Sequence, residues 1–253
     1  MKGLQRTVLL GFCLLLVGIA PAGLHADDPL DKPAVVDENV FNFVRIRYNG
    51  YSGVGMWGAG DWVPPWAHDY PRAEKNFLQI LSEMTTVETT PQSYLILDLD
   101  DPRIMDFPIL YVSEPGYWNC TDAETDNLRE YLSRGGFVIF DDFRDAPGEW
   151  DTFSGCMKRV FPDRPLEVLT ADHPVFHCFY DIDDLHMVPP YEVPGEPTFY
   201  GMSDPDGRLQ VVANFNNDIG DYWEWSDQSF VPIKLSNEAY KFGINYIIYA
   251  LTH

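Results

Sequence analysis

The spacing of apolar residues changes along the chain between a strand-like and a helix-like period, and these changes predict strands that alternate with helices. The predicted strands are short apolar or alternating runs, and they cover 40–50, 93–99, 107–116, 137–140, 166–169 and 208–215. The predicted helices repeat apolar residues at three- and four-residue intervals, and they cover 72–84, 121–135, about 150–160 and about 237–251.

Helix signals are most complete at the start of the predicted helix 121–135. Thr121 is the expected N-cap, and Glu124 completes a capping box with it. The earlier helix is expected to carry one apolar face, made of Phe77, Leu78, Leu81 and Met84.

Alternating strands and helices are typical of a mostly parallel sheet that helices cover on both faces. We therefore predict an α/β fold, a three-layer sandwich, and residues 40–253 suit one domain of this kind. In such sheets, ligands bind outside the carboxyl ends of the strands. The stretch 50–69 is aperiodic and rich in glycine and tryptophan, which indicates a binding loop or lid at that edge.

The first residues have the three parts of a secretory signal. A positively charged start precedes an apolar run over 8–19, and small residues near Ala26 suit cleavage. The run is shorter than the roughly 20 residues that a membrane-spanning helix needs. We expect a signal peptide over 1–26, a flexible lead-in over 27–39 and an exported protein, periplasmic or secreted, without stable membrane insertion after cleavage.

The chain is strongly acidic. It has 17 Lys+Arg against 39 Asp+Glu, for a net charge of −22. Such a surface repels phosphate backbones and anionic lipids, so nucleic acid is not an expected partner. Cations and neutral polar ligands remain compatible with this charge.

Three cysteines remain after the expected signal cleavage: Cys120, Cys156 and Cys178. An odd number leaves at least one outside any disulfide within the chain. Export permits disulfides, but the sequence favours no particular pairing.

Polar and aromatic residues gather where the predicted strands end. The candidate ligand-binding residues lie at these ends or in the long loop, and they are Arg47, Tyr48, Asn49, Trp62, Asn216, Asn217 and Asp218. Aromatic faces beside amide and carboxylate groups suit a neutral polar ligand such as a carbohydrate, and the same residue types anchor protein partners. Several of these rings are equally expected to pack the loop onto the sheet.

A divalent metal is the second candidate ligand. Asp141 and Asp142 end a central strand. His173 follows a later strand and is expected near the same edge, with His177 one helical turn further on. Carboxylates with imidazoles suit zinc, manganese or iron, so these four residues are candidate ligands, with His68 as an outside candidate. A straight strand would point the two aspartates to opposite faces.

Simpler roles for the same residues stay open. The pair His173-Pro174 is also typical of a helix entrance, with Asp172 as N-cap and Pro174 at the first helical position. Arg45 and Arg47 share one face of their strand, so either could neutralise the aspartates in place of a metal.

Paired carboxylates also permit acid–base hydrolysis. Glu114 ends another strand, and with Asp141 or Asp142 it could supply an acid and a base if one environment raises a pKa. The tract DIDD at 181–184 lacks the glycine and distal glutamate of a calcium loop, so a solvated turn is expected there.

A series of motifs resembles one known family over nearly the whole chain, roughly 40–253. In chain order the motifs are FPILYVSEPG, LREYLSRGGFVIFDDF, MKRVFPD, DHPVFHCFYDI, FNNDIGDYWEW and GINYIIYALTH. They are similar to the bacterial domain-of-unknown-function family numbered forty-one fifty-nine. The resemblance implies a class I glutamine amidotransferase-like, flavodoxin-like sandwich, and it implies no established activity.

Amidotransferases of that wider fold group carry a nucleophilic cysteine on a sharp turn between strand and helix. The strand that looks equivalent here is GGFVIFDDF, and its turn holds Asp141 and Asp142. No G-x-C-x-G occurs in the chain, so glutamine amidotransferase activity is not expected.

Two functional hypotheses follow from these observations. The first is a non-catalytic binding module for a polar, carbohydrate-like ligand or an envelope protein partner at the carboxyl edge of the sheet. The alternative is a metal-dependent hydrolase that uses Asp141, Asp142 and His173. Only the alternative predicts a stoichiometric metal that the change Asp141→Asn removes.

Overall fold

A computed structural model of the chain describes residues 36, 39–50, 63–188 and 195–253. The expected signal peptide and Trp62 lie outside these residues, as do most of the lead-in and most of the 50–69 loop. Among the described helices, none is both long enough and apolar enough to cross a membrane.

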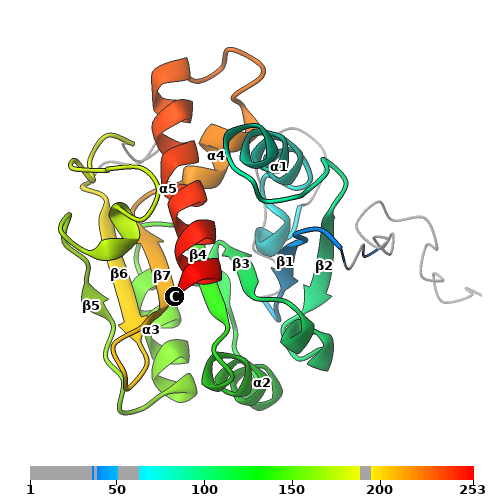
Figure 1. Cartoon of the computed structure of the whole chain (residues 1–253). Coiled ribbons are helices and arrows are strands. Elements are labelled where there is room, and N and C mark those ends of the chain that lie inside the picture. Colours follow the sequence, from blue (N-terminus) through cyan, green and yellow to red (C-terminus); the bar gives the residue numbers. More distant parts are fainter. Residues whose placement is uncertain (1–35, 37–38, 51–62, 189–194) are drawn as a thin grey trace, which may run out of the picture. The chain divides into compact units, whose positions relative to one another are not determined.

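The described strands form one sheet (Figure 1). In chain order they are β1 (Phe43–Arg47), β2 (Tyr94–Asp98), β3 (Ile109–Ser113), β4 (Phe137–Phe143), β5 (Glu167–Val168), β6 (Thr198–Ser203) and β7 (Leu209–Phe215). Their order in the sheet is β2-β1-β3-β4-β7-β6-β5. The pairs from β2 to β7 are parallel, while β6 pairs antiparallel with both β7 and β5. The predicted, mostly parallel sheet is confirmed.

Helices cover both faces of this sheet (Figure 1). They are α1 (Arg72–Met84), α2 (Asp122–Ser133), α3 (Glu149–Val160), α4 (Ile219–Glu224) and α5 (Ile233–Thr252). α2 and α3 pack together on one face, and α1, α4 and α5 pack together on the other. This arrangement is consistent with the predicted three-layer α/β sandwich.

The central strand β4 is buried along its whole length. Ile139 belongs to the core beneath α1, α4 and α5. Its neighbour Phe140 points to the other layer, where its ring lies 4.9 Å from that of Phe153 in α3. A strand covered on both faces is expected to be continuously apolar. The charged pair Asp141-Asp142 at its carboxyl end therefore needs a separate explanation.

Helix boundaries follow the sequence signals in most places. The capping box of Thr121 and Glu124 at the start of α2 is confirmed. On the predicted face of α1, Leu78 and Leu81 are buried, whereas Met84 is 51% exposed. Met84 is the last residue of the helix and lies a turn beyond the part that packs on the sheet.

Two elements escaped prediction. β6 is a short strand with Gly201 at its centre, and glycine is depleted in strands. α4 is a helix of six residues that begins at Ile219, shortly after the end of β7 at Phe215. A helix of fewer than two turns is too short for its apolar period to be recognised.

One disulfide links the two helices of one layer. Cys120, just before α2, is bonded to Cys156 in α3, across a sequence separation of 36. Closing a loop of this length stabilises a protein by about 3–4 kcal/mol in the chain-entropy model. Cys178 is free and half-buried, which agrees with the odd number of cysteines in the domain.

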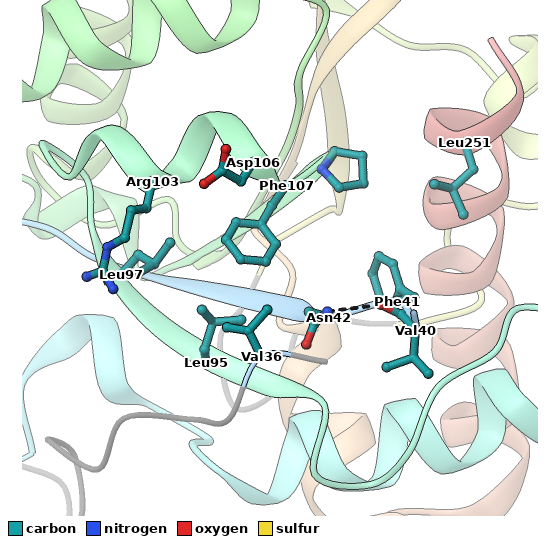
Figure 2. Close-up of a pocket in the computed structure, with 11 residues that line it drawn as sticks. Val36, Val40, Phe41, Asn42, Leu95, Leu97, Arg103, Asp106, Phe107 and Leu251 are labelled. Atoms are coloured by element: carbon teal, nitrogen blue, oxygen red, sulfur yellow. Dashed lines mark hydrogen bonds between the residues drawn. The ribbon is translucent and has the colours of Figure 1, made fainter. Parts of the chain in front are cut away.

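A cavity of about 780 Å³ lies at the amino edge of the sheet, and Figure 2 shows the residues that line it. Mainly apolar side chains line it, and they come from the segment before β1, from β2, from the segment before β3 and from the end of α5: Val36, Val40, Phe41, Leu95, Leu97, Phe107, Pro108 and Leu251. None of the residues that the sequence selected for a site lines this cavity.

Candidate metal centre

Backbone strain is concentrated around the carboxyl edge of the sheet. Asp69, Glu114, Asp142 and Asn216 all adopt left-handed conformations, with φ of 67°, 47°, 56° and 54°. Such a conformation costs about 1–2 kcal/mol for a residue with a side chain, and it persists only where the surrounding structure holds it. Asp and Asn tolerate this conformation better than other residues do, so Glu114 is the unusual one, and the side chains at this edge decide whether it is a site.

Asp141 anchors the start of α4. Its carboxylate accepts hydrogen bonds from Tyr111 Oη (2.8 Å), Asn214 Nδ2 (2.9 Å) and the backbone N–H groups of Ile219 (3.3 Å) and Gly220 (2.8 Å). Burial raises the pKa of Asp141 to about 6, and the hydrogen bonds from Asn214 and Tyr111 limit the rise. The side chain is satisfied within the protein, which leaves it little capacity to hold a metal.

Asp142 faces a different region from Asp141, at a point where the ladder between β4 and β7 shifts register, between Phe140 and Phe143. One carboxylate oxygen lies 2.8 Å from His68 Nδ1, and the other lies 3.4 Å from Arg144 Nη2. Burial would raise the pKa of Asp142, but the hydrogen bond and charge of His68 lower it. The two adjacent aspartates thus separate, as the alternation of a strand predicts.

Arg45 holds the segment that brings His68 and Asp69 to this edge. Its buried guanidinium pairs with Glu74 of α1 and donates hydrogen bonds to the carbonyls of Trp66 (3.1 Å) and His68 (2.7 Å). A buried arginine that binds two carbonyls of one turn fixes the path of that turn. Arg45 is therefore a support for the site and does not neutralise the aspartates of β4.

α4 brings three more carboxylates to the same place. Asp218 is its N-cap and accepts a hydrogen bond from the backbone N–H of Asp221 (3.0 Å). Asp221 and Glu224 are three residues apart, so they lie on one side of the helix. Because Asp141 fixes the first turn of α4, it also fixes the position of these carboxylates.

These side chains form a single group, which we call the acidic cluster: His68, Asp69, Asp142, Asp218, Asp221 and Glu224. Within it, three sets of potential ligand atoms lie within 4.8 Å of one another. The sets are His68 with Asp69 and Asp142, His68 with Asp218 and Asp221, and Asp69 with Asp221 and Glu224.

Several carboxylate oxygens of the acidic cluster lack hydrogen bonds. Both oxygens of Asp69 and Oδ2 of Asp218 are buried and accept none. The side chain of Asp69 is 0% exposed, and its nearest positively charged neighbour is His68, whose Nδ1 lies 3.2 Å from Oδ1. Burying a charge without compensation costs several kcal/mol. Protons or a cation must therefore offset this charge.

Shifts in pKa describe the proton-bound form of the acidic cluster. Burial, strengthened by neighbouring carboxylates, raises the pKa of Asp69, Asp218 and Asp221. Burial would lower the pKa of His68, but the charge of Asp69 and the contact with Asp142 raise it to about 11. A divalent cation would replace these protons, and carboxylate oxygens with an imidazole nitrogen suit manganese, zinc or iron.

Glu114 lies next to the acidic cluster without belonging to it. Burial and the charge of Asp142 raise the pKa of Glu114 well above its ordinary value. Its backbone is fixed, because its N–H donates to the carbonyl of Asp141 (3.0 Å) and its carbonyl accepts from Tyr48 Oη (2.6 Å). The sequence candidates Glu114 and Asp142 are thus brought together.

Most of the predicted ligand-binding residues have structural contacts. Arg47 forms an ion pair with Asp98 at the end of β2. Asn49, Asn216 and Asn217 donate their side-chain N–H groups to backbone carbonyls of other segments. Of the predicted ligand-binding residues that the structure describes, only Asp218 joins the acidic cluster.

The aromatic residues near this edge mostly belong to the core. Tyr48, Trp66, Tyr222 and Trp223 are all buried. The burial of Tyr48, a candidate ligand-binding residue, agrees with the expectation that rings near this edge pack against the sheet.

His173 lies away from Asp141 and Asp142, and the expectation that it shares their edge is wrong. Its ring lies 6.3 Å from that of Tyr249. Tyr249 in turn contacts Phe137 and Leu209, the first residues of β4 and β7. After β5 the chain runs to the C-terminal end of α5, which lies at the amino ends of the strands, and His173 therefore lies there too.

The turn after His173 has a local structural role. Pro174 begins a short 3₁₀ turn, as predicted, but the cap is His173 and not Asp172. His173 Nδ1 accepts a hydrogen bond from a backbone N–H, and His177 contacts Asp181 and a backbone carbonyl. Neither histidine belongs to the acidic cluster.

Sequence reasoning missed Asp69, Asp221 and Glu224, and it named His68 only as an outside candidate. One signal was present: after the last strand, carboxylates recur at three-residue spacing from Asp218 onward. That spacing places them on one side of a helix. It becomes visible only once α4 is known to be helical.

Residues 42–251 match the family model described as Domain of unknown function (DUF4159). No curated protein matches the chain. The matched region begins just before β1 and ends within the last turn of α5, so it contains the whole sheet and the acidic cluster. The chain belongs to the DUF4159 family.

Proposed function

We propose that the protein binds a divalent cation at the acidic cluster and uses it to hydrolyse a polar substrate. The observation that carries this proposal is Asp69. Its carboxylate is fully buried, neither oxygen accepts a hydrogen bond, and it faces His68 and the carboxylates of the cluster. An anion in that position requires a counter-charge, and a cation bound by several of these groups supplies it.

Hydrolysis follows from what a bound cation does to water. A divalent cation held by carboxylates and an imidazole lowers the pKa of a bound water and makes it a nucleophile. Glu114 is the candidate base, since it lies beside Asp142 and its pKa is raised. Arg144, which faces Asp142 at 3.4 Å, is positioned to hold an oxygen of the substrate.

A metal titration of the metal-free protein tests this proposal first. Isothermal titration with Mn²⁺ and Zn²⁺ should give stoichiometric binding, and elemental analysis after desalting should recover the metal. Asp69→Asn should weaken binding at least about 100-fold, because even partners outside the first ligand shell change affinity 10–100-fold. The matched control is Asp183→Asn, which removes an exposed carboxylate and should bind as the parent does.

Turnover separates catalysis from binding alone. The metal-loaded protein would be assayed against chromogenic esters, phosphoesters, amides and glycosides, with Glu114→Gln as the comparison. Glu114→Gln should retain the metal and lose most of any turnover. Metal binding without turnover on any substrate class would instead support the non-catalytic binding module. No metal binding would overturn the proposal.

We also propose that the protein is exported. The disulfide between Cys120 and Cys156 supports this, because such bonds persist in oxidising compartments. Mass spectrometry of the protein recovered from outside the cytoplasm should find a chain that begins near residue 27. A full-length chain retained in the cytoplasm with both thiols free would contradict it.

A further inference from the structure

We infer that the acidic cluster holds two divalent cations, with Asp69 as the carboxylate between them. This inference rests on the proposed function, since it requires that the cluster bind cations at all. It concerns the number of metals and the role of each ligand, which the proposed function leaves open.

The shape of the acidic cluster is the first reason. Among the described residues, no set of ligand atoms within 4.8 Å of one another contains both Asp142 and Glu224. The cluster therefore has two ends, one at His68 with Asp142 and one at Asp221 with Glu224. A single cation in contact with one end leaves the other without a ligand role.

Charge is the second reason. The acidic cluster contains five carboxylates: Asp69, Asp142, Asp218, Asp221 and Glu224. One divalent cation offsets two of these charges, and the remaining ones stay in a largely buried site, which is costly. Two divalent cations offset four charges, and the guanidinium of Arg144 beside Asp142 offsets the fifth. The balance closes without protons on the carboxylates.

Asp69 has the properties of a bridging ligand. It is the only residue shared by the sets at the two ends of the acidic cluster. Neither oxygen accepts a hydrogen bond, and Oδ1 lies 3.2 Å from His68 Nδ1, a potential ligand of one cation, while the carboxyl also faces that of Asp221 at the other end. Carboxylates bridge in this way in two-metal sites, where the ions lie about 3.5–4 Å apart and clamp the attacking and leaving oxygens.

The space next to Asp69 exists because residue 220 is a glycine. A Cβ atom on residue 220 would collide with Asp69 Oδ2 and would lie 2.7 Å from Tyr111 Oη. Gly220 therefore lets the first turn of α4 approach the carboxylate closely. The same glycine donates its N–H to Asp141, so the close approach is fixed on both sides.

The experiment counts metals and detects their proximity. Metal-free protein is titrated with Mn²⁺, bound metal is measured after desalting, and electron paramagnetic resonance reports coupling between adjacent ions. We expect two equivalents and a coupled spectrum for the parent and for the control Asp183→Asn. Glu224→Gln and Asp142→Asn should each retain one equivalent with an uncoupled spectrum, because each removes one end.

Each other result has a definite meaning. One equivalent in the parent, lost in both Glu224→Gln and Asp142→Asn, would overturn the two-cation inference and leave the proposed function intact. Two equivalents without coupling would overturn the bridging role of Asp69. No bound Mn²⁺ in the parent would overturn both proposals. Glu224 is only partly buried, so Glu224→Gln is expected to fold and keeps the test decisive.

Discussion

The carboxyl edge of the sheet contains two regions that begin at neighbouring residues. Asp141 faces a region where every acceptor is used: four donors surround its carboxylate, and two of them are backbone N–H groups. Asp142 faces the acidic cluster, where the only donor near the carboxylate of Asp69 among the described residues is His68, with Nδ1 3.2 Å from Oδ1. Asp141 and Asp69 are both buried, so burial alone does not distinguish a structural charge from a functional one. The number of hydrogen-bond donors around each carboxylate distinguishes them.

The difference also divides the roles of the surrounding elements. In the Asp141 region, Tyr111, Asn214 and the start of α4 complete each other's hydrogen bonds, and such networks specify one structure. In the acidic cluster, like charges are held together at a cost to stability, a pattern typical of sites that bind something. The first region fixes α4, and α4 then carries the carboxylates of the second.

The largest effect is expected for a substitution at Arg45, which supports both the acidic cluster and the core. Arg45→Met leaves Glu74 as a buried, unpaired charge and frees the carbonyls of Trp66 and His68. The free energy of unfolding should fall by about 4 kcal/mol, measured by urea denaturation. The double variant Arg45→Met with Glu74→Met should regain most of this loss yet bind metal poorly. If the double variant binds Mn²⁺ like the parent, Arg45 does not position His68 and Asp69.

A smaller loss is expected in the region that is fully satisfied. Asp141→Asn replaces one acceptor oxygen by an amide that faces donors, so at least one of Tyr111, Asn214 and Gly220 loses its partner. We expect a decrease of about 3 kcal/mol in the free energy of unfolding. An unchanged denaturation midpoint would show that the network tolerates an amide. It would also contradict the structural role that we assign to Asp141.

The same substitution at Asp69 should have the opposite sign. Burial raises the pKa of Asp69, so at neutral pH its charge opposes folding when no metal is bound. Asp69→Asn should therefore raise the free energy of unfolding of the metal-free protein by about 1 kcal/mol. The gain should shrink or reverse when Mn²⁺ is added, because only the parent binds it tightly. Destabilisation of the metal-free protein by this change would mean that Asp69 is structural, like Asp141.

The sequence predicted the fold well because its signals are local. Strand and helix periods, the capping box at Thr121 and the rule about carboxyl edges do not depend on distant contacts. They led to a parallel sheet and to Asp141, Asp142, Glu114 and Asp218 at one edge. What Asp142 faces was not predictable, because its partner His68 comes from a turn 74 residues earlier in the chain.

The residues of the acidic cluster were harder to predict because they depend on short or irregular segments. Asp221 and Glu224 lie on α4, which is too short to be recognised by periodicity. Asp69 reaches the edge through a turn that Arg45 fixes by side-chain contacts. His173 was expected at the wrong edge because a residue that follows a parallel strand normally lies at the carboxyl edge. β5 has only two residues, and the chain after it runs to the end of α5 near Tyr249.

The smallest expected effect concerns His173, and it separates a cap from a metal ligand. Asn is a good N-cap, so His173→Asn should change the free energy of unfolding at pH 8 by no more than about 0.5 kcal/mol. It should bind Mn²⁺ like the parent, because His173 lies outside the acidic cluster. Loss of metal in this variant would restore His173 as a ligand and overturn the assignment of the acidic cluster.

The same variant has a defined pH dependence. Burial lowers the pKa of His173 below its ordinary value of 6.5, so the unfolded chain binds its proton more tightly than the folded protein does. The parent should therefore lose stability relative to His173→Asn as pH falls through about 6.5, and the difference should be constant above it. The half-exposed ring is screened by solvent, so a change of a few tenths of a kcal/mol is expected between pH 8 and pH 5. If the parent instead lost stability relative to His173→Asn as pH rises, His173 would have to be charged in the folded state. The structure does not allow this charge, because Nδ1 accepts a hydrogen bond from Val175 and so carries no proton.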